Sequence, residues 1–108
     1  MSAYLIVNYN VENPERYGEY SAAAGPVMKI GDVAQIVAFD GDSQKLEGSP
    51  GHQTIVLSFE TMEAAKEIYE SGDYQKLIPV RHEATSNHFA VLINGIGYPS
   101  RGAAVLGS

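Results

Sequence analysis

The chain consists of short apolar runs and amphipathic segments, separated by turn-forming residues. The first run, residues 3–11, is rich in β-branched and aromatic residues and contains no Gly or Pro, which predicts a strand. Comparable runs at residues 33–39, 52–60 and 87–94 predict three further strands. The pattern therefore indicates a four-stranded protein.

An amphipathic segment after the first strand predicts a helix. Asn13 supplies an N-cap residue, and Pro14 suits the first helical position. Tyr17 and Tyr20 begin an apolar face at helical spacing. Pro26 is expected to kink or break this helix because proline lacks an amide hydrogen.

A second helix is predicted after the third strand. Thr61 can cap the segment 62–71, in which apolar residues form one stripe and acidic residues face solvent. A further turn or helix over residues 74–81 leads into the fourth strand. The order β-α-β-β-α-β predicts an α+β, ferredoxin-like sandwich over residues 1–95, with two helices on one face of an antiparallel sheet.

The second face of this sheet has no cover within the chain. The first, second and fourth predicted strands are apolar on nearly both faces, as in strands that are buried on both sides. A second copy of the sheet, related by a two-fold axis, is the simplest cover, so we expect a homodimer with its sheets face to face or joined into a barrel. Residues 96–108 show no periodicity and predict a C-terminal arm, either flexible or packed on the dimer.

Composition removes several classes of function. The 108 residues carry a net charge of −6 and no basic cluster, which argues against a nucleic-acid partner. The absence of cysteine excludes disulfides, a thiolate nucleophile and the usual structural zinc sites. The apolar start has no basic residues and is too short to cross a bilayer, so we expect a cytoplasmic protein without a membrane partner.

Four residues are candidates for ligand binding. Asn8 interrupts an apolar strand and needs a polar partner, which is either a ligand or a satisfied contact in the core or dimer. Tyr17 and Tyr20 lie three residues apart, so both hydroxyls can face one cleft; the alternative is a core position with the hydroxyls at its rim. Arg81 offers a planar fork for a carboxylate, and the alternative is an ion pair with Glu60 or Glu83.

The histidines are the candidates for proton transfer, because imidazole titrates near neutral pH. His52 and His88 each open a predicted strand, and if those ends are neighbours the two side chains can share a catalytic site. The alternative is that these residues, with His82, are surface histidines. Their spacing from Glu60 and Glu83 is unlike that of known metal motifs, so we expect no metal and no cofactor.

Two stretches resemble a known family. Residues Asn13, Pro14, Glu15, Tyr17 and Tyr20, together with the run SFETMEAAKEIYESGDYQKLIPVR at 58–81, are similar to the domain of unknown function 1330 family within the dimeric α+β barrel superfamily. The resemblance covers most of residues 3–94. It implies a ferredoxin-like dimer and no established reaction.

The wider superfamily adds an expectation about function. Its members often bind small molecules between sheet and helices, and some are cofactor-free monooxygenases. One hypothesis is therefore a dimeric protein that binds a small aromatic or carboxylated molecule, with or without monooxygenase-like or isomerase-like activity. The other is a non-catalytic structural or binding module whose polar residues only specify the dimer. Where family members often carry a glycine pair and arginines, this chain has DVAQ at 32–35 and AFD at 38–40.

Overall fold

The computed structural model describes residues 2–96. Four strands and four helical segments follow one another along this part of the chain: β1 (Ala3–Val11), α1 (Pro14–Val27), β2 (Ala34–Asp40), β3 (Gln53–Phe59), α2 (Met62–Tyr69), α3 (Gly72–Gln75), α4 (Ile78–Ala84) and β4 (Thr85–Asn94).

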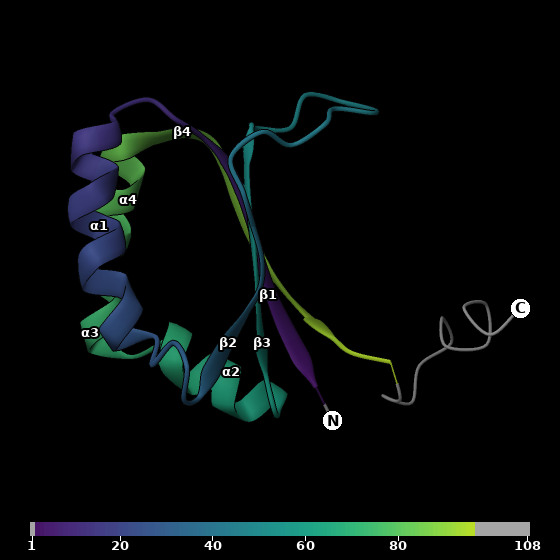
Figure 1. Ribbon diagram of the computed structural model, residues 1–108. Helices are drawn as coiled ribbons and strands as arrows, with labels where there is room; N and C mark the ends of the chain where they lie inside the picture. Colours follow the sequence, from purple (N-terminus) through teal and green to yellow (C-terminus); the bar gives the residue numbers. More distant parts are fainter. Residues whose placement is uncertain (1, 97–108) are drawn as a thin grey trace, which may run out of the picture.

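The strands form one antiparallel sheet in the order β2-β3-β1-β4. The first strand therefore lies at the centre and pairs with two strands that are distant in sequence. All the helices lie on one side of the sheet, and the loop between β2 and β3 projects to the other side (Figure 1). This arrangement confirms the expected ferredoxin-like α+β fold.

The helices begin where the sequence places their caps. Asn13 accepts a hydrogen bond from the Arg16 amide, and Thr61 accepts one from the Ala64 amide. Helix α1 continues through Pro26 and ends at Val27. The helix tolerates Pro26 because a proline in the last turn removes only one backbone donor. The segment predicted as one turn or helix at 74–81 forms two short helices, α3 and α4.

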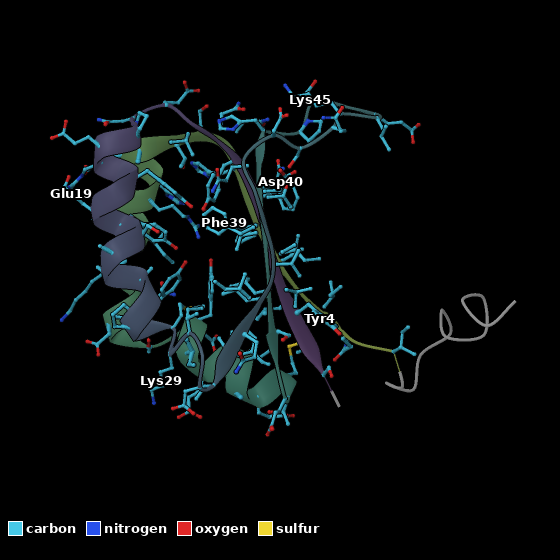
Figure 2. All side chains as sticks on the ribbon, in the orientation of Figure 1. Tyr4, Glu19, Lys29, Phe39, Asp40 and Lys45 are labelled. Atoms are coloured by element: carbon cyan, nitrogen blue, oxygen red, sulfur yellow. The ribbon has the colours of Figure 1, made fainter. Side chains whose placement is uncertain are left out.

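The core lies between the sheet and the helices. Along β1, Ala3, Leu5, Val7 and Tyr9 are buried and alternate with residues that point to the opposite face. The paired strand β3 contributes Leu57 and Phe59 to the same side. Figure 2 shows the two sides of the sheet: Phe39 lies on the helix side and Tyr4 on the opposite side.

We call the face that points away from the helices the outer sheet face. It is defined by Tyr4, Ile6, Val56, Phe89, Val91 and Ile93, which share this face through the registers of β1 with β3 and β4. Phe89 is 52% exposed, Val91 41% and Ile93 40%. The apolar second face expected from the sequence is therefore present and uncovered in the single chain.

The C-terminal arm predicted at residues 96–108 lies outside the described residues except for residue 96. Within residues 2–96, no helix is long and apolar enough to cross a membrane.

Candidate functional site

A cavity of about 200 Å³ lies between the sheet and helix α1. Most of its lining is apolar and comes from β1, α1, β2 and β3. Ile36 and Phe39 line the cavity and yet are 52% and 56% exposed, so the cavity opens at the edge strand β2. An engineered apolar cavity of about 150 Å³ holds benzene, so this space suits a molecule of one aromatic ring.

Tyrosines are prominent in the lining of the cavity. Four of them line it: Tyr9, Tyr17, Tyr20 and Tyr74. Their hydroxyls form two pairs, Tyr9 with Tyr17 and Tyr20 with Tyr74, each at 2.7 Å between oxygens. The rings also contact one another edge-on or tilted, with centroids of Tyr17 and Tyr20 5.7 Å apart. The two pairs therefore form one continuous aromatic wall.

Arg81 lies behind this wall. It is 3% exposed, its Nη1 donates to the Tyr74 hydroxyl at 3.0 Å, and its guanidinium carbon lies 5.9 Å from the Tyr9 ring centroid. Within residues 2–96, Arg81 forms no ion pair and its Nε has no hydrogen-bond partner. Glu83, one expected partner, instead pairs with Arg16 at 3.0 Å. A buried cation without a carboxylate leaves positive potential beside the cavity.

Burial fixes the protonation of the site. Desolvation raises the pKa of Tyr9, Tyr17 and Tyr74, and the Tyr17 hydroxyl raises that of Tyr9 further. Desolvation lowers the pKa of Arg81, but the tyrosine oxygens around it, Tyr74 first, outweigh this and leave the pKa raised. At neutral pH these tyrosines are therefore hydrogen-bond donors rather than bases, and Arg81 is a cation.

Asn8 lies apart from the cavity. It alternates with Val7 and Tyr9, so its side chain is on the other side of β1. Its Nδ2 donates to the Gly51 carbonyl at 3.1 Å and to Thr54 Oγ1 at 3.0 Å, while its Oδ1 accepts from the Gly51 amide at 2.6 Å. Asn8 thus joins the β2–β3 loop to the central strand, which satisfies its amide inside the protein.

His52 also holds this loop. The Val11 amide donates to Nε2 at 3.0 Å, so the ring proton is on Nδ1 and is donated to the Gly41 carbonyl at 3.0 Å. Both ring nitrogens are therefore used within the protein. His52 is not among the residues that line the cavity.

His88 lies against His82 rather than in the cavity. The two rings stack with centroids 4.0 Å apart and planes 3° apart, and both residues are exposed. Desolvation, followed by the neighbouring His88 and Arg81, lowers the pKa of His82. Among residues 2–96, no three His, Asp or Glu side chains are grouped as a metal site would require.

The structure therefore brings Tyr17, Tyr20 and Arg81 together and leaves Asn8, His52 and His88 elsewhere. Two cavity tyrosines, Tyr9 and Tyr74, were missing from the candidates. Tyr9 was predictable from the sequence, since alternation along the strand puts it on the same face as Leu5 and Val7. Tyr74 has no such signal, because its position depends on how the short helix α3 packs beneath α1.

Four antiparallel strands beneath one layer of helices make this chain a ferredoxin-like α+β protein. Residues 2–96 match the model of DUF1330, a domain of unknown function, and the chain belongs to this family. The match confirms the resemblance seen in the sequence. No curated protein sequence matches the chain significantly.

Solved structures share the fold at low sequence identity. A protein of unknown function from Rhodopseudomonas palustris has a TM-score of 0.68 at 14% identity, with 88% of this chain and 82% of that chain covered. A dimeric ferredoxin-like protein of unknown function from Thermobifida fusca has a TM-score of 0.63 at 13% identity, with 88% and 92% covered. SnoaB, a cofactor-independent oxygenase from Streptomyces nogalater, has a TM-score of 0.62 at 6% identity, with 93% and 96% covered.

Proposed function

We propose that this protein binds a small aromatic or carboxylated molecule in the tyrosine-lined cavity. The observation that carries the proposal is the cavity itself: a mostly apolar space of about 200 Å³ lined by four tyrosines whose hydroxyls form two hydrogen-bonded pairs. Ligand sites typically combine a mostly apolar lining with a few polar groups that orient the ligand. The opening at β2 gives the ligand a route of entry.

The proposed active form is a homodimer that pairs the outer sheet faces. Phe89, Val91 and Ile93 leave an apolar patch on a strand, and such patches usually mark an interface. The Thermobifida fusca relative, described as dimeric, supports this assembly. The cavity lies on the helix side of the sheet, so pairing of the outer sheet faces would not cover its entrance at β2.

Cofactor-independent oxygenation of the bound molecule is a second candidate, favoured by the likeness to SnoaB. Among residues 2–96, the cavity is lined by no His, Asp, Glu or Lys, and the pKa values of Tyr9 and Tyr74 are raised by burial, so these two hydroxyls keep their protons at neutral pH. The protein therefore supplies orientation and hydrogen-bond donors, and the reactivity has to come from the substrate. Oxygen uptake in the presence of an ionised phenol, compared with a reaction without protein, distinguishes this candidate from binding alone.

A substitution that fills the cavity tests the binding proposal. Ala24 lines the cavity and is buried, whereas Ala22 lies on the exposed side of the same helix. Ala24→Leu is expected to weaken binding of benzyl alcohol about tenfold or more, while Ala22→Leu leaves the affinity unchanged, as measured by calorimetry. Native mass spectrometry of the protein purified from its own cells identifies the natural ligand. Equal affinities in the two variants, or no binding by the unsubstituted protein, contradict the proposal.

A further inference from the structure

In each of the two tyrosine pairs, one hydroxyl proton has no described acceptor. A hydroxyl pair can place only one proton between its two oxygens, so each tyrosine pair has one proton left over. The other polar groups that reach these pairs, Arg81 and Gln53, donate as well: Arg81 to Tyr74 at 3.0 Å and Gln53 to Tyr17 at 3.4 Å. Among the described side chains that hydrogen-bond to these two pairs, none therefore accepts the remaining protons.

Arg81 sets a direction along one of the pairs. Guanidinium can only donate, so the Tyr74 oxygen accepts from Arg81 and the proton of the Tyr74 hydroxyl is donated elsewhere. Hydrogen bonds in a chain strengthen one another when each group accepts at one side and donates at the other. The favoured chain runs from Arg81 to Tyr74, from Tyr74 to Tyr20, and leaves the Tyr20 proton for a further acceptor.

The charge balance indicates which acceptor fits. Arg81 is buried, has an unpartnered Nε and forms no ion pair within residues 2–96. Removing a cation from water without a counter-charge is unfavourable, and an anion nearby would relieve it. A neutral ligand would satisfy the free hydroxyl but leave the charge of Arg81 uncompensated.

We propose that the cavity selects organic anions, with an apolar body among the aliphatic side chains and an anionic oxygen that accepts from Tyr20. Arg81 is then a positioning residue: it does not line the cavity and acts through Tyr74. This inference rests on the proposed binding function and adds the charge of the ligand and the residues that select it.

Two probes of equal ring size test this inference. Benzoate carries an anionic carboxylate, and benzyl alcohol is neutral; both suit a space that holds one aromatic ring. Calorimetry is expected to show that the protein binds benzoate about tenfold or more tightly than benzyl alcohol, because charge-assisted hydrogen bonds are the stronger ones.

The variants separate selectivity from folding. Tyr20→Phe and Arg81→Met are expected to bring the ratio of the two affinities close to one, because each weakens the binding of benzoate more than the binding of benzyl alcohol. The benzyl alcohol that each variant still binds shows that the variant is folded. Ser21→Ala is the control, since Ser21 also lines the cavity but belongs to neither tyrosine pair, and it should keep the preference for benzoate. Arg81→Lys should restore part of the preference that Arg81→Met loses, because it keeps the charge.

The outcomes distinguish the two proposals. Binding of benzyl alcohol with no preference for benzoate overturns the anion inference and leaves the cavity as a binding site. A preference that survives both Tyr20→Phe and Arg81→Met overturns the role given to these residues. Binding of neither probe overturns the proposed function as well.

Discussion

At the scale of single residues, Arg81 places a positive charge in the core without a carboxylate beside it among residues 2–96. Within residues 2–96, Arg81 packs among tyrosines, donates to the Tyr74 hydroxyl and pairs with no carboxylate. Removing one partner of a buried ion pair typically costs about 3–5 kcal/mol, because the other charge is left alone. Replacing Arg81 breaks no ion pair within residues 2–96, so this cost is not expected. The proposed anion preference gives this charge a role toward a ligand.

Arg81→Met tests this point in the absence of ligand. Methionine keeps much of the volume and removes the uncompensated charge, so we expect a free energy of unfolding within about 1 kcal/mol of the original value, or higher. Chemical denaturation followed by circular dichroism measures it. A loss of about 3 kcal/mol or more would show that Arg81 stabilises the fold through a partner not seen in residues 2–96.

The stacked pair of His82 and His88 makes a prediction about pH. The pKa of His82 is lowered in the folded state, so the unfolded chain binds more protons near that pKa. The stabilising contribution is therefore complete above the unfolded pKa of about 6.5 and is lost as the pH falls below it.

The prediction is checked by the pH dependence of the melting temperature. Between about pH 7.5 and 5.5, the original protein should lose more thermal stability than His82→Gln, because glutamine does not titrate. The matched control is Ala22→Gln on the exposed side of α1, which adds or removes no titratable group and should leave the pH profile of the original protein unchanged. Parallel pH profiles for the original protein and His82→Gln would contradict the expectation.

At the scale of elements, the β2–β3 loop is attached to the central strand by side chains that the sequence offered as functional candidates. Asn8 forms three hydrogen bonds to Gly51 and Thr54, and His52 joins Val11 to Gly41. Together they place one end of the loop directly against the backbone of β1. The approach is so close that a side chain at Gly51 has no room.

Gly51→Ala should therefore be strongly destabilising. A Cβ at this position would lie 2.2 Å from the carbonyl carbon of Tyr9, and backbone cannot rotate away as a side chain can. We expect a loss of about 2–4 kcal/mol, the range of severe packing defects.

Gly18→Ala is the matched control, measured by the same denaturation experiment. Gly18 lies within α1, and a Cβ there meets nothing within 4 Å. The substitution should stabilise the protein by about 0.5–1 kcal/mol, since alanine favours the helix. A neutral effect of Gly51→Ala would show that the loop can move away from β1.

The elements were largely predictable from the sequence, and the site only partly. The caps at Asn13 and Thr61 are local signals, and helix spacing alone placed Tyr17 and Tyr20 on one face. The surroundings of Arg81 depend on long-range packing: its neighbour Tyr74 is local, but Tyr9 comes from the other end of the chain. A polar residue in a strand, such as Asn8, shows only that a partner is needed and does not identify it.

At the scale of the whole molecule, the uncovered outer sheet face predicts association. Val91→Asp places a charge between the exposed side chains of Phe89 and Ile93 on this face and should weaken the dimer about tenfold or more, as measured by sedimentation equilibrium at low micromolar concentration. Ala22→Asp, on the exposed side of α1, should leave the association unchanged. A monomeric unsubstituted protein at this concentration would rule out the dimer.

The central position of β1 also has a consequence for how the chain is made. This strand is synthesised first, but both of its neighbours, β3 and β4, come much later in the sequence. The nascent chain therefore carries an apolar strand that cannot complete its pairing until β4 has left the ribosome. Pairings between distant segments form slowly and expose aggregation-prone strands in the meantime. The strand order therefore delays completion of the sheet until its last strand has been synthesised.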